Sequence, residues 1–119
     1  MRFIKYLCFV FAPLFLFLNT SAFAYIEKET AVLRVMNKAA GKTQTVSGKV
    51  GDSIQYDGLN IKIRNCKQTD PFDPENFFAF LEIYTKTDER IFSGWMNHNE
   101  PGQNPLQDDT YDVWLEKCE

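Results

Sequence analysis

The chain has 119 residues, 13 basic and 16 acidic side chains, and a formal net charge of −3. This length allows one domain. A mildly acidic surface argues against a nucleic-acid partner, because nucleic acids are bound by basic patches. The sequence contains no internal repeat and no low-complexity run.

The first 24 residues have the organisation of a secretory signal peptide. Arg2 and Lys5 precede an apolar run from Tyr6 to Leu18, and Ala22-Phe23-Ala24 matches an A-x-A cleavage pattern. The run is shorter than the roughly 20 residues of a transmembrane helix. We therefore expect cleavage after this pattern and a periplasmic domain of residues 25–119 with no membrane span; an uncleaved anchor is the alternative.

Export would leave two of the three cysteines. Cys8 is lost with the signal peptide, and Cys66 and Cys118 remain. An even number of cysteines in a small exported domain predicts a disulfide, because that compartment is oxidising. Metal binding by the same pair would need further ligands, and the chain has one histidine, so we expect neither a metal nor a cofactor.

The mature chain begins with a mixed segment, 25–30, that we expect to be frayed. Strands are then predicted at 31–36 and 43–50, the second of them polar enough for a sheet edge. Asp57-Gly58 lies between Ser53–Tyr56 and Leu59–Arg64, which alternate apolar and polar residues. This pattern predicts a hairpin with a two-residue type I′ turn.

The second half begins with a loop at 67–75, with at most one helical turn at 73–76 after Asp73 as N-cap. A central strand covered on both faces is expected at 77–85, followed by strands at 91–96 and 111–118 around a long polar loop, 97–110. These segments predict an all-β fold, a small antiparallel β-sandwich or partly open barrel of about seven strands with one disulfide.

The disulfide conflicts with strict alternation along the hairpin. Alternation places Cys66 on the polar face that carries Lys62 and Arg64. A bond to Cys118 therefore requires either a bulge near Asn65 or a polar face that is partly covered by the last strand.

Three motifs in the second half of the chain carry a resemblance. Phe92-Ser93-Gly94-Trp95-Met96, Asn104-Pro105-Leu106, and Tyr111-Asp112-Val113-Trp114-Leu115 with Cys118 resemble a bacterial family filed as domain of unknown function 2155. The resemblance implies an exported protein to which no activity is assigned. Genes of this family are also associated with the gene of an accessory subunit of respiratory complex I, which suggests a link to that complex.

Few residues offer catalytic chemistry. His98 is the only histidine, and no G-x-S-x-G motif accompanies it. Asp108, Asp109 and Asp112 lack the spacing of a calcium loop, so a solvated acidic turn is expected. Trp114 lies on the more polar face of its strand, where it either packs on the disulfide or serves as an exposed anchor for a partner.

These observations favour a non-enzymatic binding module for a protein or an envelope component, because long polar loops on a β scaffold usually carry binding residues. An accessory or assembly factor for an inner-membrane respiratory complex, and a small hydrolase that uses His98 with Asp108 or Asp109, are the alternatives. The predicted binding residues are Trp95, His98, Asn104, Asp109, Tyr111 and Trp114.

Overall fold

The central hairpin forms as predicted. The computed structural model of the protein describes residues 24–119, and in it β4 (Ser53–Tyr56) pairs with the start of β5 (Leu59–Gln68). Asp57 and Gly58 have φ of 47° and 89°, and positive φ at both positions is what a type I′ turn requires. The register expected from a two-residue turn is confirmed.

The described residues contain eight strands and no helix, so the all-β prediction is confirmed. The expected signal peptide, apart from Ala24, lies outside the described residues. Across 24–119 no helix is long and apolar enough to cross a membrane. The remaining strands are β1 (Ile26–Glu27), β2 (Thr30–Asn37), β3 (Lys42–Lys49), β6 (Phe77–Tyr84), β7 (Arg90–Asn97) and β8 (Tyr111–Cys118).

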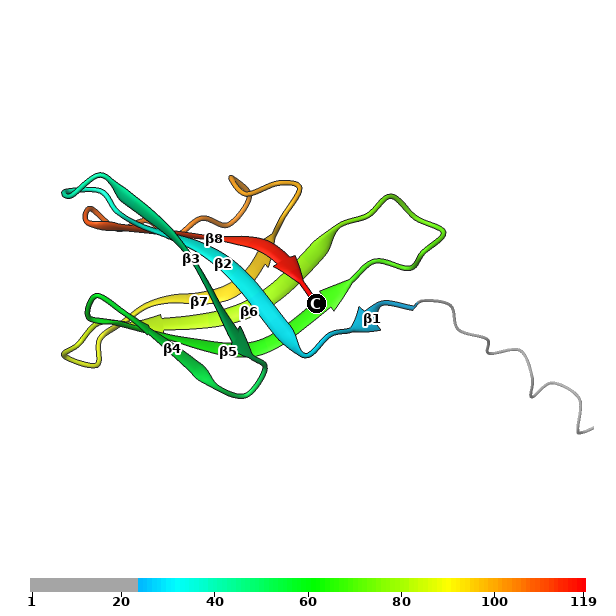
Figure 1. Cartoon of the computed structure of the whole chain (residues 1–119), viewed down its shortest axis with the longest axis horizontal. Helices are drawn as coiled ribbons and strands as arrows, with labels where there is room; N and C mark the ends of the chain where they lie inside the picture. The colour runs from blue at the N-terminus through cyan, green and yellow to red at the C-terminus, as the bar shows by residue number, and fades with distance from the viewer. Residues whose placement is uncertain (1–23) are drawn as a thin grey trace, which may run out of the picture.

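The strands form two antiparallel sheets. One has the order β3-β2-β8, and the other has the order β1-β5-β6-β7 with β4 also paired to β5. Figure 1 shows the first sheet as a layer lying across the second. The polar strand β3 lies at a sheet edge, as predicted. The two sheets do not close into a barrel, so the fold is a sandwich.

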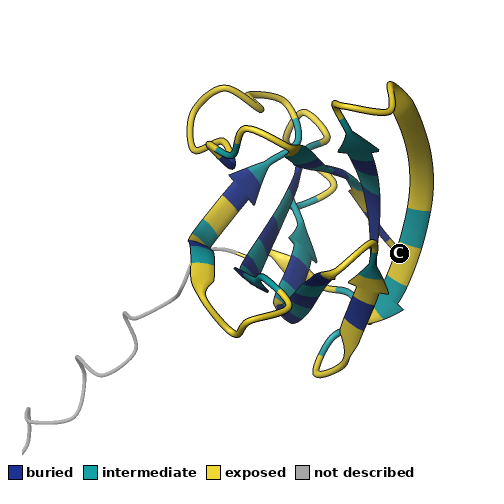
Figure 2. Cartoon of the chain, turned by 90° about the vertical axis from the view of Figure 1, so that its left-hand side faces the viewer, coloured by how far each residue is buried: buried dark blue, intermediate teal, exposed yellow. Residues whose placement is uncertain are grey.

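The core lies between the two sheets, as the dark blue bands along the strands in Figure 2 show. Alternate residues of the strands face inward, because side chains alternate along a β-strand. Full burial of an aliphatic side chain contributes about 1.5–3 kcal/mol. The largest aliphatic side chains that are fully buried are Leu33, Leu59, Ile61, Ile63, Leu81 and Ile83.

Two bulges bring the cysteines together. The pairing of β5 with β6 shifts between Ile63 and Asn65, and this moves Cys66 to the inner face, where it is fully buried. The pairing of β2 with β8 skips Glu116, which moves Cys118 inward in the same way. The predicted disulfide is present, with 5.6 Å between the two Cα atoms, and it joins one sheet to the other.

One local prediction, near the N-terminal end of the domain, is wrong, and the single helical turn allowed before β6 does not form. The expected frayed lead-in contains β1, which pairs with Lys67 and Gln68 at the end of β5. No helical turn forms at 73–76. Instead, Asp70 accepts a hydrogen bond from the N–H of Phe72 through its side chain and from the N–H of Asp73 through its backbone. This local turn replaces the helix start expected at Asp73.

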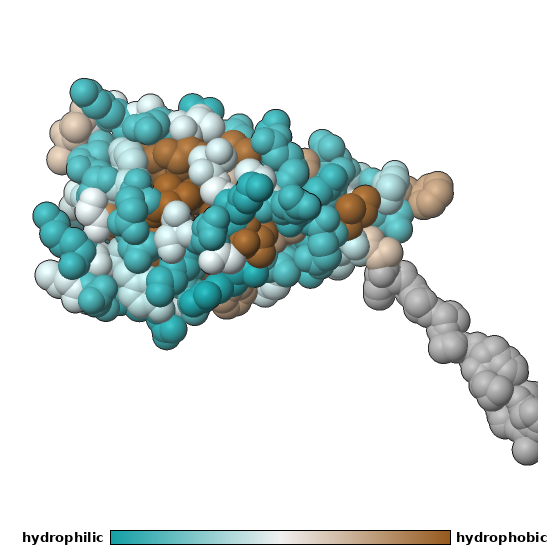
Figure 3. Space-filling model, turned by 60° about the horizontal axis from the view of Figure 1, so that its bottom comes forward, coloured by the Kyte–Doolittle hydropathy of each residue, from teal (hydrophilic) through white to brown (hydrophobic). Residues whose placement is uncertain are grey.

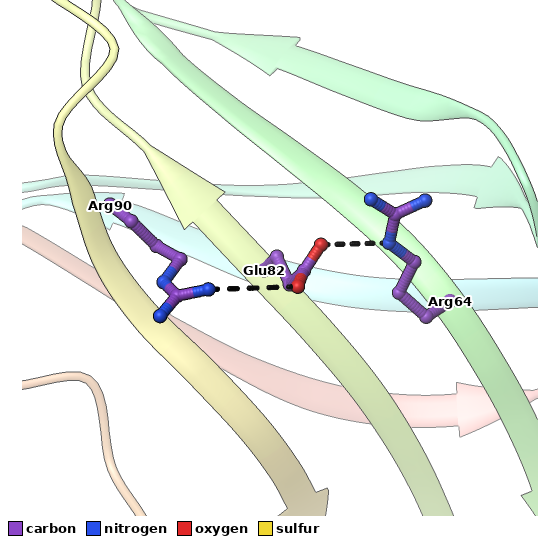
Figure 4. A network of polar contacts seen from close by, with 3 residues as sticks. All are labelled: Arg64, Glu82 and Arg90. Atoms are coloured by element: carbon purple, nitrogen blue, oxygen red, sulfur yellow. Dashed lines mark hydrogen bonds and ion pairs between the residues drawn. The ribbon is translucent and has the colours of Figure 1, made fainter.

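The outer face of the larger sheet is only half covered. β6 is central, as predicted, but its outward side chains are partly exposed, so the expectation of cover on both faces is wrong. On this face Glu82 lies between Arg64, at 2.8 Å, and Arg90, at 4.0 Å (Figure 4). Apolar surface forms separate small areas among hydrophilic ones on the face seen in Figure 3.

Candidate functional site

The side of the sandwich between β7 and β8 is open. β7 is the last strand of the larger sheet and β8 is the last strand of the smaller one. The connection between them, residues 98–110, runs over this side (Figure 1). One edge of each sheet therefore meets a single loop.

Three residues fix this loop against β7. Leu106 is buried in the core, with 4% of its surface exposed. The amide of Asn104 donates a hydrogen bond to the carbonyl of Trp95 at 3.1 Å. A Cβ at Gly94 would lie 2.6 Å from the same amide nitrogen, so the absence of a side chain at Gly94 allows the loop to approach the strand.

A cleft of about 340 Å³ lies between this loop and β8. Its volume falls at the lower end of the range of about 300–1,000 Å³ that is typical of ligand pockets. The cleft, called the edge cleft below, is lined by Met96 and Asn97 at the end of β7, by Pro101, Gly102 and Pro105 in the loop, and by residues 112–115 of β8.

The edge cleft contains backbone groups of β8 that no other strand pairs with. The N–H of Lys38 donates to the carbonyl of Thr110. This bond shows which residues of β8 direct their backbone groups toward β2. In an antiparallel ladder every second residue bonds to the partner strand, so Trp114 bonds to β2 while Val113 and Leu115 direct their backbone groups outward. Within residues 24–119, the N–H and C=O of Val113 and the N–H of Leu115 have no hydrogen-bond partner.

The segment around the cleft is acidic. Residues 97–116 contain no lysine or arginine. Asp112 lines the cleft itself, whereas Glu116 pairs with Arg34 at 3.6 Å, and an unpaired carboxylate in a cleft attracts positively charged partners. The acidic residues of the segment are Glu100, Asp108, Asp109, Asp112 and Glu116.

Trp114 is the predicted binding residue that lines the cleft. It is half-buried, on the face of β8 opposite the buried Val113 and Leu115. The bulge at Glu116 turns Cys118 toward the core. Trp114 and the disulfide therefore lie on opposite faces of the sheet, and the tryptophan remains open to contact from the cleft.

His98 connects the end of β7 to the edge of β8. Its Nδ1 lies 3.1 Å from the carbonyl oxygen of Leu115, and because a carbonyl only accepts, Nδ1 carries a proton and donates. The ring also packs edge-on against Phe77, with 5.8 Å between the ring centres. The Asp108 carboxylate accepts hydrogen bonds from the backbone N–H groups of residues 110 and 111. These bonds hold Asp108 to its own loop rather than to His98.

Tyr111 lies at the far end of β8 from Cys118. Its hydroxyl donates to the backbone carbonyl of Asp57 at 2.6 Å and lies 3.2 Å from the carboxylate of the same residue. Burial raises the pKa of the Tyr111 phenol above its ordinary value, and the neighbouring carboxylate raises it further. These contacts attach β8 to the hairpin turn, which is a structural role.

The other predicted residues lie outside the cleft. Asn104 anchors the loop, and Asp109 is exposed in it. Trp95 is 40% exposed on the outer face of the larger sheet, where it packs edge-on against Phe80 at 5.4 Å. The ammonium group of Lys67 lies 4.7 Å from the centre of the indole ring. The two tryptophans therefore belong to different surfaces.

Sequence reasoning missed most of the cleft lining. Pro101, Gly102 and Pro105 signalled only a loop, and Met96 and Val113 signalled only a core. The long polar loop, 97–110, pointed to the region, and the absence of lysine and arginine from 97–116 is a further signal that could have done so. Nothing in the sequence indicated that the two strand edges leave a gap at this place.

The fold and the cleft define a class of protein: a small, disulfide-linked antiparallel β-sandwich with a ligand-sized cleft along one open edge. The family described as "Uncharacterized protein conserved in bacteria (DUF2155)" matches residues 31–118. The chain belongs to this family, and the resemblance of the motifs is confirmed. No curated protein and no solved structure matches the chain.

Proposed function

We propose that the protein is an exported, non-enzymatic binding module of the bacterial envelope and that its protein or envelope partner binds in the edge cleft. The observation that supports this most is the combination, in one cleft, of apolar side chains, Trp114 and the unpaired backbone of Val113. Binding sites usually join an apolar lining to a few polar groups that converge on it.

Export is supported by two independent features. The N-terminal segment has the order of charges, apolar residues and small residues that signal peptides have. The buried Cys66–Cys118 bond is of the kind that persists in oxidising compartments. A periplasmic location satisfies both.

The two alternatives draw less support. A hydrolase that uses His98 with Asp108 needs the imidazole paired with the carboxylate, but the hydrogen bond of His98 Nδ1 goes to a backbone carbonyl and the Asp108 carboxylate accepts backbone N–H groups. A role in assembling a respiratory complex is a special case of the proposed binding function, in which the partner belongs to an inner-membrane complex. The cleft geometry does not favour that partner over others.

Photo-crosslinking in intact cells tests the proposal. A photoreactive side chain at the exposed, cleft-lining Pro101 should give a defined adduct, and the same group at Gln44, exposed on β3, should not. Gly102→Trp should weaken or abolish the adduct, because it adds a bulky side chain to the cleft lining, and the fold should tolerate it because a Cβ there meets nothing within 4 Å. Gln107→Trp, in the same loop but outside the cleft, is the matched control. Equal adducts from both photoreactive positions would contradict the proposal.

A further inference from the structure

The outward edge of β8 has the hydrogen-bonding pattern of a strand that lacks a neighbour. The N–H and C=O of Val113 and the N–H of Leu115 face the edge cleft without partners in residues 24–119. The carbonyl of Leu115 accepts a hydrogen bond from His98. An unpaired strand edge is a template for another extended chain, and the addition of a peptide strand to such an edge is an established mode of recognition.

We propose that the edge cleft binds an extended, basic peptide segment of a partner protein, which adds to the smaller sheet as a strand beside β8. This inference rests on the proposed binding function and names the ligand class. Three backbone hydrogen bonds are available at once, two at Val113 and one at Leu115. Displacing His98 would free a fourth backbone group, the carbonyl of Leu115.

The cleft also specifies which side chains such a strand would carry. Alternate residues of an added strand point to opposite faces. On the inner side they would meet the apolar Met96 and Pro105, and on the outer side they would meet Asp112 and Trp114. A carboxylate beside an aromatic ring suits a lysine ammonium group. The matching peptide therefore alternates apolar residues with lysine.

Charge distinguishes this occupant from a second copy of the chain. The segment 97–116 has five acidic and no basic residues, so two copies paired through β8 would bring like charges together, which is unfavourable. A basic peptide would instead gain from Asp112, the carboxylate that lines the cleft. The association constant of the peptide should therefore fall as the salt concentration rises.

The probes are three capped heptapeptides that alternate lysine with valine, isoleucine or phenylalanine. The full exported protein is used, with Trp95→Phe so that Trp114 alone reports binding by fluorescence. We expect at least one peptide to bind, and N-methylation of its backbone, which leaves every side chain unchanged, to weaken binding at least tenfold. Replacing its lysines by glutamate should do the same.

Hydrogen exchange on the unsubstituted protein supplies the structural readout. The amides of Val113 and Leu115 should become protected when the peptide binds, whereas the amide of Trp114, already bonded to β2, should change little. Binding that is insensitive to N-methylation would overturn strand addition but leave the proposed function of the cleft intact. Absence of binding by all three peptides at about 1 mM, or a dimer in which Val113 is already protected, would also overturn it.

Discussion

Removal of the disulfide should cost the domain much of its stability. The bond closes a loop of 52 residues between Cys66 and Cys118, and the chain-entropy relation gives about 4 kcal/mol for a loop of this length. Domains of this size have free energies of unfolding of about 5–15 kcal/mol. The variant with both cysteines replaced by alanine should therefore retain only a fraction of the stability.

Urea unfolding followed by circular dichroism measures this change. Alanine is the suitable replacement because serine would bury two hydroxyl groups at positions that are 0% and 3% exposed. The melting temperature should fall by about 15–30 °C. Two alkylatable thiols in the unreduced wild-type protein, together with an unchanged urea midpoint in the variant, would show that no disulfide stabilises the domain.

Three further changes give defined outcomes. Gly48→Ala should lower the free energy of unfolding by about 1–3 kcal/mol, because its Cβ would lie 2.7 Å from a buried isoleucine, whereas Gly102→Ala should be neutral; urea midpoints compare the two. The raised pKa of Tyr111 means that its contribution is present below the pKa of the unfolded phenol, about 10, and is lost as pH rises through the folded value. Tyr111→Phe should therefore flatten the alkaline loss of stability in a pH series, and an unaltered profile would speak against this. Asn104→Ala should accelerate hydrogen exchange across residues 98–110 while exchange in β5 stays constant; equal exchange in both proteins would show that the bond to Trp95 does not hold the loop.

The strands were predictable where alternation and turn chemistry agree. Asp57-Gly58 fixed the hairpin because few residues adopt positive φ at both turn positions. The last strand has the predicted bounds, 111–118, since apolar residues alternate along it without interruption until Leu115. The disulfide followed from the count of cysteines rather than from geometry.

The features that escaped prediction depend on contacts between distant segments. The bulges near Asn65 and at Glu116 insert single residues where two strands fall out of step, and only the first was anticipated, as one of two options. β1 forms because the end of β5 offers it a free edge. The edge cleft arises where β7 and β8 do not pair, which no local pattern in either strand encodes.

Only one of the predicted binding residues lines the cleft, again because its place depends on how distant segments pack. Trp114 reaches the cleft because its strand is a sheet edge, whereas Trp95 lies on the outer face of the other sheet. Tyr111, Asn104 and His98 are polar or aromatic residues near loops, which sequence reasoning interprets as binding groups. Their side chains instead hold the loop and the strand ends in place through hydrogen bonds.

Hydrogen exchange along β8 of the free protein tests most directly whether the edge cleft holds an open strand edge. The backbone N–H groups of Val113 and Leu115 point into the cleft, and those of Asp112 and Trp114 bond to β2. An open strand edge predicts an alternating pattern, with fast exchange at Val113 and Leu115 and slow exchange at Asp112 and Trp114. Uniformly slow exchange at all four positions would mean that the edge is already paired or covered, and the edge cleft would then hold no open strand.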